Sequence, residues 1–600
     1  MKIKFNKKLG LHILYIAILS LILTLSSFIY IDTKVSFIFL TKIWTRPVIL
    51  LMNFLPIFLF MLILFFLLNS IGLSFLLTGT SIFIMGEANK NMLTFRSENV
   101  RITYLKLLKE ALDMVKKGIT MPKGNIYYFY IILIIIISII IFKYMKYKVN
   151  RRERITGFIL STSIFIILLN TLFINKNIYS KHSLGIYNEY SETRISQDRG
   201  LVYPFLYYYN DFLFKKPKDY DESKVIKKLS SYQEENPKEK VNIFLILGES
   251  FADLEKMGAK VSPETYASFR KLEENSITGS ILNNTYGGGT IKAERYNYLG
   301  SKMEPLYKDN VNTFIWMLKK EGYHTKSMHP FYGFYYNRKG ANKYLGFDEF
   351  LYLDNYFDKY YKAKDGSYFP DKLLFKQILK DYEQRDKNKY YFNSVITMQN
   401  HIPYSKTKEQ DELLDKKSFK GSKEDYNEAN NYLAGIKNTG DELLKFIEKL
   451  ENDSSPVVVI FFGDHLANLG RSGSSYKDMG VDISLDNKEG WLRHYETPYI
   501  IWANKEAKAK LNMDFKGHNE VFSNYYLFSY ALNILGFKTP YIKYLNERRE
   551  KYPVDSFRYI KENNKLTGHP SKEAMEDRKL LTMIEYYNLR YFKYSNLVKK

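Results

Sequence analysis

Two short polar pieces follow apolar runs that lie far apart in the sequence. Glu249 comes shortly after the run Val241–Leu247, and Asp464 and His465 follow the run Pro456–Phe462. A lone carboxylate in the position of Glu249 is either a ligand at the edge of a sheet or a neighbour of a helix N-cap, and both interpretations stay open. The adjacent oxygen and nitrogen donors of Asp464 and His465 suit a borderline divalent ion. Taken together, the two pieces predict the halves of one metal site.

A threonine that follows three glycines lies between these two pieces. Gly287–Gly289 lead into Thr290, and Ile291–Leu299 form a candidate helix whose N-terminus favours an anion. A threonine hydroxyl is a poor nucleophile until a metal or a base lowers its pKa. Threonine is also a good helix N-cap, so this residue alone does not decide between the two roles. In combination with the two metal half-sites, Thr290 predicts a metal-activated hydroxyl and hence phosphoryl-type transfer.

Two histidines and an arginine provide further candidates for substrate contacts. His401 follows an apolar run, where it can bind a phosphate or protonate a leaving alkoxide. His329 precedes the aromatic segment 331–336, and Arg338 follows it. Arginine offers a planar fork that matches phosphate oxygens, and aromatic neighbours suit a glycerol or lipid headgroup. Each histidine also has a structural alternative.

The chain divides into an apolar and a mixed part. Its 600 residues are too many for one ordinary core. Residues 1–175 hold long apolar runs and are predicted to form a transmembrane domain, and residues 176–240 resemble a tether. From residue 241 to residue 600, short apolar strands alternate with helical stretches, which predicts an α/β domain with a mainly parallel sheet. The polar motifs come just after the strands, where open α/β sheets place their active sites.

Five apolar segments are long enough to be candidates for membrane spans. They are Leu11–Ile31, two segments within Val48–Met85 that turn near Asn69 and Ser70, Tyr127–Phe142 and Ile155–Ile174. Basic clusters before the first span and between the last two predict that these loops lie inside, so the C-terminal part lies outside. No Ala-x-Ala site follows the first span, which favours an anchor over a cleaved signal peptide. The basic segment 87–125 fits either a helix lying flat on anionic lipid or a solvated connecting helix.

Charge and cysteine content narrow the choice of partners. Lysine and arginine outnumber aspartate and glutamate by 88 to 64, and such a basic excess suits nucleic acid, a lipid surface or an anionic substrate. No zinc-finger spacing, basic zipper or RNP-like motif is present, which argues against nucleic acid. The chain has no cysteine, which excludes disulfides, thiolate metal sites and cysteine nucleophiles.

In their order and spacing, these motifs resemble the lipoteichoic acid synthase-like membrane enzymes of the alkaline phosphatase/sulfatase superfamily. The likeness covers nearly the whole chain. The matching pieces are Gly248-Glu249-Ser250-Phe251, Gly287-Gly288-Gly289-Thr290 with Glu294, Asn337-Arg338, Asn400-His401-Ile402-Pro403, Gly463-Asp464-His465 and the closing segment Ile584–Tyr591. The resemblance implies a bundle of about five transmembrane helices and an extracellular α/β domain of the alkaline phosphatase/sulfatase fold. It also implies a multi-pass protein in the cell membrane of a Gram-positive type bacterium.

The resemblance further implies a reaction and a set of site residues. One divalent metal, Mn²⁺ or alternatively Mg²⁺, would be held by Glu249, Thr290, Asp464 and His465. Thr290 would attack the phosphodiester of phosphatidylglycerol, releasing diacylglycerol and forming a glycerophospho-threonine. A hydroxyl of a teichoic-acid-like polymer or a glycolipid would then take the glycerophosphate. The substrate-binding residues implied are Arg338, His401, Tyr336 and His329.

Departures from the family pattern keep other functions open. The loop before the nucleophile has the form Gly-Gly-Gly-Thr instead of Gly-Lys-Thr, and Lys292 follows the threonine. The alternative is therefore a phosphoethanolamine or capsular-glycan phosphotransferase of the same superfamily. A sulfatase or phosphodiesterase is less favoured, because the usual sulfatase nucleophile is a modified cysteine or serine in a proline-arginine pattern. An inactive binding module has no need of the retained Thr290. The sequence does not predict the oligomeric state.

Overall fold

The computed structural model describes residues 7–28, 41–96, 99–102, 125–145, 148–184, 195–209, 216–305, 307, 309–362, 368–407 and 411–590. The chain forms two compact units, Met1–Leu213 and Phe214–Lys600. The division between them falls inside the predicted tether of residues 176–240. Most of the basic segment 87–125 lies outside the described residues, and so does Tyr591 at the end of the predicted closing segment.

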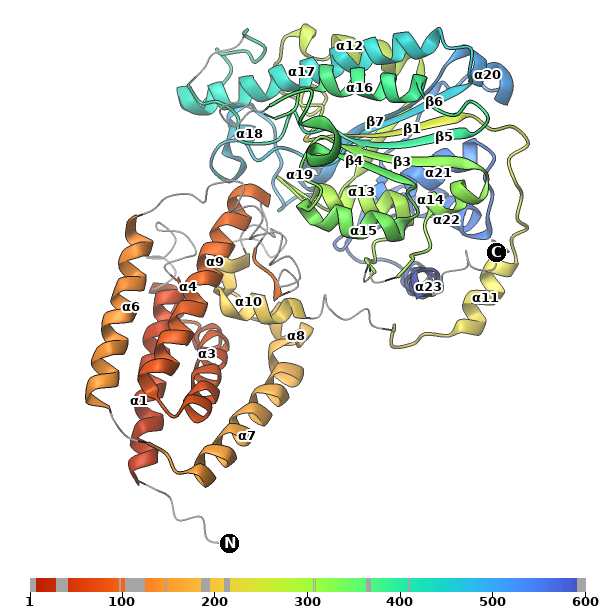
Figure 1. Ribbon diagram of the computed structural model, residues 1–600. Helices are drawn as coiled ribbons and strands as arrows, with labels where there is room; N and C mark the ends of the chain where they lie inside the picture. Colours follow the sequence, from red (N-terminus) through yellow and green to blue (C-terminus); the bar gives the residue numbers. More distant parts are fainter. Residues whose placement is uncertain are drawn as a thin grey trace. The chain divides into compact units, whose positions relative to one another are not determined.

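The first unit is a bundle of apolar helices (Figure 1). They are α1 (Lys7–Ser27), α3 (Pro47–Leu68), α4 (Ile71–Arg96), α6 (Asn125–Tyr144) and α7 (Arg151–Leu168), the last continued by a π-helix over Leu169–Phe173. Within the described part of the chain, four helices are long and apolar enough to cross a membrane, and Phe129–Tyr144 of α6 is a shorter apolar helix. The predicted turn between two spans is confirmed at Asn69, which ends α3 in the left-handed conformation (φ 55°).

Three short helices follow α7 and fold onto the bundle: α8 (Lys176–Lys181), α9 (Ile195–Arg199) and α10 (Val202–Tyr207). Asn53, buried in α3, holds α9 and α10 in place. Its Oδ1 accepts hydrogen bonds from the backbone N–H groups of Val202 (3.0 Å) and Tyr203 (3.1 Å), and its Nδ2 donates to the Arg199 carbonyl (2.9 Å). A buried asparagine in an apolar helix is stable only when such partners are present. The first part of residues 176–240 is therefore packed against the bundle.

The second unit contains a nine-stranded mixed sheet with the order β4-β3-β5-β1-β6-β7-β2-β8, in which β9 also pairs with β2. The strands are β1 (Asn242–Gly248), β2 (Ser276–Leu282), β3 (Tyr323–His329), β4 (Glu349–Tyr352), β5 (Tyr390–Ile396), β6 (Val457–Gly463), β7 (Glu496–Ala503), β8 (Gly517–His518) and β9 (Phe522–Ser523). β7 runs antiparallel to β6 and β2, whereas the other pairings are parallel. The mainly parallel α/β sheet is confirmed.

Helices cover both faces of this sheet (Figure 1). One face carries α12 (Ala267–Glu274), α16 (Asp371–Glu383) and α17 (Lys423–Glu451), and the other carries α14 (Phe314–Lys320), α21 (Leu527–Ile534), α22 (Pro540–Lys551) and α23 (Lys572–Arg590). The remaining α-helices and strands are α11 (Glu222–Ser230), α13 (Thr290–Leu299), α15 (Arg338–Leu345), α18 (Ser474–Asp478), α19 (Lys488–Tyr495), α20 (Lys505–Leu511) and the hairpin β10 (Ile560–Glu562) and β11 (Lys565–Thr567).

Strand β1 shows why both faces must be covered. Phe244 and Ile246 enter one core, while Ile243 and Leu245 enter the other.

The carboxyl ends of the parallel strands lie at one edge of the sheet. Strands β1, β3, β5 and β6 end at Gly248, His329, Ile396 and Gly463. The apolar runs Val241–Leu247 and Pro456–Phe462 coincide with β1 and β6 to within one residue at each end. Polar residues that follow these strands must therefore meet at this edge.

Candidate metal centre

The register of β1 and β6 brings the two predicted half-sites together. Gly248 pairs with Gly463, so Glu249 and Asp464 leave neighbouring strands at the same level. Glycine is required at position 463, because a Cβ there would lie 1.9 Å from the Phe251 carbonyl oxygen. Ser250 has a left-handed backbone (φ 52°), and its N–H donates to Asp464 Oδ1 at 2.7 Å. The loop after β1 is thus fastened to the loop after β6.

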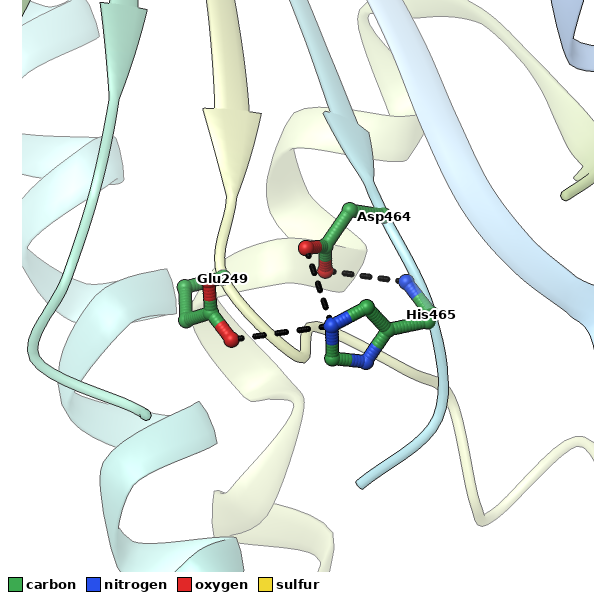
Figure 2. Close-up of side chains that lie close together, drawn as sticks. All are labelled: Glu249, Asp464 and His465. Atoms are coloured by element: carbon green, nitrogen blue, oxygen red, sulfur yellow. Dashed lines mark hydrogen bonds and ion pairs between the residues drawn. The ribbon is translucent and has the colours of Figure 1, made fainter. Parts of the chain in front are cut away.

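Glu249, Asp464 and His465 form a compact, buried group (Figure 2). Each offers one ligand atom, and these atoms lie within 4.8 Å of one another. His465 Nε2 lies 3.7 Å from Glu249 Oε1 and 3.2 Å from Asp464 Oδ2. The side chains are at most 3% exposed, so water cannot screen their charges. Two buried carboxylates and an imidazole in this geometry form a candidate cation site.

The proton positions support a bound cation at this group. His465 Nδ1 lies 3.0 Å from the Leu466 carbonyl, which can only accept, so Nδ1 carries the proton and Nε2 presents a lone pair. That lone pair faces Asp464 Oδ2, a buried oxygen that accepts no hydrogen bond from the described residues. Burial raises the pKa of Glu249 to about 8, and the neighbouring Asp464 carboxylate acts in the same direction. A cation between the three groups would satisfy the bare oxygen and separate the facing lone pairs, so the residues fit a divalent metal.

Thr290 reaches this group from the start of α13. Its Oγ1 donates to Glu249 Oε2 at 3.2 Å and lies 3.4 Å from His465 Nε2. The glycines before it have φ values of 64°, 157° and 88°, a backbone path that only glycine follows without strain. The N–H of Gly287 donates to the Leu466 carbonyl at 2.9 Å. The glycine loop therefore positions the hydroxyl against two of the three candidate ligands.

Arg338, the first residue of α15, lies beside the same helix. Its Nε and one terminal nitrogen bind Glu294 Oε2 at 2.9 Å and 2.8 Å. Glu294 follows Thr290 by four residues, one helical turn, so the two side chains share a face of α13. The other terminal nitrogen of Arg338, Nη1, is buried without a hydrogen-bond partner among the described residues. The guanidinium also lies 5.3 Å from the ring centre of Tyr336, whose backbone is left-handed (φ 56°).

The two predicted substrate histidines differ in their surroundings. His329 ends β3 and is buried; its Nδ1 lies 3.2 Å from the Ile396 carbonyl, and its Nε2 has no partner among the described residues. Burial, together with nearby Arg338, holds the pKa of His329 well below its usual value. His401 is partly exposed, and its Nδ1 lies 2.7 Å from the Ile402 carbonyl. His329 therefore keeps Nε2 for another group.

Tyr368 and Thr397 complete the neighbourhood, and the sequence motifs did not single them out. The Tyr368 hydroxyl donates to the Ile402 carbonyl at 2.8 Å and lies 3.0 Å from His401 Nδ1. The Thr397 hydroxyl oxygen accepts the Glu249 N–H at 2.9 Å. Thr397 directly follows β5, and this position could have indicated that it belongs to the site. Nothing in the local sequence indicates the same for Tyr368.

The buried carboxyl group of Asp371 is expected to make the stability of the fold depend on pH. This buried carboxyl at the start of α16 accepts a hydrogen bond from the Thr439 hydroxyl, and its N–H binds Gln399 near His401. Burial raises the pKa of Asp371 to about 7. Between pH 4 and 7 the folded protein thus holds a proton that the unfolded chain releases. The free energy of unfolding should therefore fall as pH rises through this range, by about 4 kcal/mol at most.

Thermal unfolding of the detergent-solubilised full chain across pH 4 to 8 measures this dependence. Asp371→Asn should make the pH profile less steep, whereas Asp358→Asn, at an exposed carboxylate, should leave it unchanged. An identical slope in wild type and Asp371→Asn would contradict the assignment.

Residues 241–537 match the Sulfatase family, and this domain belongs to it. The predicted resemblance to lipoteichoic acid synthase-like enzymes of the alkaline phosphatase/sulfatase superfamily is confirmed by this match and by similarity to a lipoteichoic acid synthase. The chain combines apolar N-terminal helices with a mixed α/β sulfatase-like domain, and the predicted fold class is confirmed.

Its relatives include synthases and glycan-modifying proteins. A Rhizobium meliloti protein named for cyclic β-1,2-glucan modification is 23% identical over 341 residues, 54% of this chain and 51% of that protein. The lipoteichoic acid synthase of Staphylococcus saprophyticus is 26% identical over 184 residues, 29% of this chain and 27% of the synthase. The chain thus spans about half or less of these curated relatives. The solved Streptococcus pyogenes phosphoglycerol transferase GacH, in complex with sn-glycerol-1-phosphate, is 23% identical, with a TM-score of 0.49 over 63% of this chain and 96% of that one.

Proposed function

We propose that this protein is a phosphotransferase that moves glycerophosphate from phosphatidylglycerol to a hydroxyl of a teichoic-acid-like polymer or a glycolipid. In this proposal residues 1–175 anchor the chain in the cell membrane, residues 176–240 form a tether, and residues 241–600 carry out the reaction outside the cell. The observation that carries the proposal is the Thr290 hydroxyl, which contacts both Glu249 and His465 of the candidate metal centre. A site that only binds a ligand has no need of a hydroxyl held in this way.

Glu249, Thr290, Asp464 and His465 would hold one divalent metal, Mn²⁺ by preference. When bound, that ion would supply positive charge that lowers the pKa of the hydroxyl and favours the negative charge of the reacting phosphate. In this structure the Thr290 hydroxyl donates a hydrogen bond to Glu249 Oε2. The N-terminus of α13 directs backbone N–H groups and the positive end of its dipole at an incoming anion.

The reaction balances in two displacements. Thr290 Oγ1 gives up its proton and forms a bond to phosphorus, the bond from phosphorus to the diacylglycerol oxygen breaks, and that oxygen takes up a proton. An acceptor hydroxyl then gives up its proton and bonds to the same phosphorus, the bond from phosphorus to Thr290 Oγ1 breaks, and Oγ1 takes back a proton. His401 would carry the proton transfers at the leaving and attacking oxygens, because an imidazole can both take up and release a proton near neutral pH.

Arg338 and His329 divide the recognition of the headgroup between them. The buried Nη1 of Arg338 can donate to a phosphate oxygen, which would satisfy this bare donor. His329 stays neutral and presents a lone pair at Nε2, so it recognises a hydrogen-bond donor and not a phosphate oxygen. A glycerol hydroxyl is such a donor. Tyr336 would flank the headgroup beside Arg338.

Replacing His329 tests this recognition. His329→Phe should raise KM for phosphatidylglycerol roughly tenfold to hundredfold, because a lost hydrogen bond to a buried group costs about 1–3 kcal/mol. His324→Phe, at a partly exposed histidine of the same strand, should leave KM unchanged. Diacylglycerol release from labelled lipid in the presence of Mn²⁺ is the measurement.

The donor itself is tested with the same assay. Wild-type protein should release diacylglycerol from phosphatidylglycerol and not from phosphatidylethanolamine, whose ammonium group would lie near the Arg338 charge. Turnover of phosphatidylethanolamine alone would overturn the glycerophosphate proposal in favour of phosphoethanolamine transfer. Hydrolysis of a sulfate ester without turnover of either lipid would favour a sulfatase.

A further inference from the structure

The membrane unit contains an apolar groove between α1 and α3. Its volume is about 330 Å³, and it is lined by Ala17, Ile18 and Leu21 of α1 and by Pro47, Leu50, Leu51 and Phe54 of α3. The groove opens to the outside of the bundle, because Ile18 and Leu51 at its rim are 49% and 45% exposed. The small side chain of Ala17 leaves space that a larger residue would fill. Phe54, which lines the groove, stacks on Phe58 with ring centres 5.6 Å apart.

Cationic and aromatic side chains stand at one end of this groove. Pro47 lines it, and the exposed residues Lys42, Trp44 and Arg46 come directly before Pro47. Neither Lys42 nor Arg46 forms a salt bridge with a carboxylate of the described chain, and no acidic residue occurs between positions 41 and 54. Trp44 is 64% exposed, and tryptophan favours the level of lipid headgroups at the membrane interface.

The groove and the cations lie at matching depths. Pro47 begins the apolar stretch of α3, so Arg46 and Lys42 fall at the end of the hydrocarbon region, and Leu50 to Phe54 fall within its first two turns. An acyl chain in the groove would place its headgroup beside Lys42 and Arg46. Because successive spans alternate in direction, this end of α3 is also the end at which α7 finishes.

We infer that this groove is a binding site for a diacyl phospholipid with a net negative headgroup. One acyl chain lies between α1 and α3, and the phosphate is held by Lys42 and Arg46 beneath Trp44. Apolar contact alone would accept any lipid, whereas the two unpaired cations select an anionic one. That this lipid is also the donor of the reaction rests on the proposed function; the binding site does not.

Native mass spectrometry of the full chain, released from nanodiscs of equal parts phosphatidylglycerol and phosphatidylcholine, tests the site. The Thr290→Ala protein is used, so that the result does not depend on turnover. We expect retained phosphatidylglycerol in at least tenfold excess over phosphatidylcholine. Ala17→Trp should lower the retained lipid at least tenfold, whereas Ile139→Trp, at an exposed position of α6 that does not line the groove, should not.

The charge requirement has its own variant, which alters only exposed residues and leaves the helices intact. Lys42→Gln with Arg46→Gln should still retain lipid but lose the preference for phosphatidylglycerol, whereas Lys7→Gln with Lys8→Gln should keep it. Two results would overturn the inference. One is equal retention of the two lipids by the protein with an intact groove, and the other is an unchanged preference for phosphatidylglycerol in the Lys42/Arg46 variant. Neither result would bear on diacylglycerol release by the catalytic unit, so the two proposals fail separately.

Discussion

Thr290→Ala is expected to lower diacylglycerol release by roughly 10³-fold or more, because loss of a covalent nucleophile commonly costs that much. Thr290 Oγ1 lies within hydrogen-bonding distance of Glu249 and His465, and no other hydroxyl of the described residues has this pair of contacts. Its position at the start of α13 also aims it at an anion bound by the helix N-terminus. The loss should appear in kcat, since the substrate contacts of Arg338 and His329 remain.

Thr290→Ser is the matched control. It keeps the hydroxyl on the same backbone. Its activity should stay within about tenfold of wild type, because a serine hydroxyl can act as the same kind of nucleophile. Equal activity in wild type and Thr290→Ala would eliminate the covalent mechanism. A similar loss in Thr290→Ser and Thr290→Ala would show that the methyl group matters, and would also count against the hydroxyl as nucleophile.

Asp464→Asn is expected to abolish both activity and stabilisation by divalent metal. In the wild type, Mn²⁺ at a hundred times its Kd should raise the free energy of unfolding by about 2.7 kcal/mol. Asp464 Oδ2 is the buried oxygen without a hydrogen-bond partner, so it depends most on a cation. The asparagine variant lacks the charge that attracts the ion, although it can keep the hydrogen bonds from Ser250 and His465 to Oδ1.

Thermal unfolding with and without chelator measures this effect. Asp514→Asn, at an exposed position, should respond to Mn²⁺ as the wild type does. Removal of metal should abolish turnover in the wild type, and Mn²⁺ should restore it. Retained turnover in chelator, or a metal-dependent shift of equal size in Asp464→Asn, would contradict the assigned site.

The sequence predicted the parts of the site that depend on strand pattern. Glu249, Asp464 and His465 follow apolar runs, and parallel strands carry their carboxyl ends to one edge. The sequence could not show that Gly248 pairs with Gly463, because register depends on contacts between segments more than 200 residues apart. Once the two strands are neighbours, residue type and pattern are enough to bring Glu249, Asp464 and His465 together as a candidate metal site.

Other features depend on packing that no local pattern encodes. Tyr368, just before α16, contacts His401 and Ile402, which lie more than 30 residues further along the chain. The proton on His329 Nδ1 depends on the Ile396 carbonyl of a neighbouring strand. In the membrane unit, Asn53 is a polar residue within an apolar span, and its hydrogen bonds connect α9 and α10 to α3. Residues predicted as part of a tether are therefore packed against the bundle.

Mass spectrometry of the Thr290 peptide tests the central claim most directly. Wild-type protein is incubated with Mn²⁺ and phosphatidylglycerol without an acceptor, quenched in acid and digested. The proposed mechanism predicts a glycerophosphoryl group on Thr290, absent after chelation and absent from Thr290→Ala. Diacylglycerol release at the normal rate with no adduct on Thr290, or with the adduct on another residue, would contradict it.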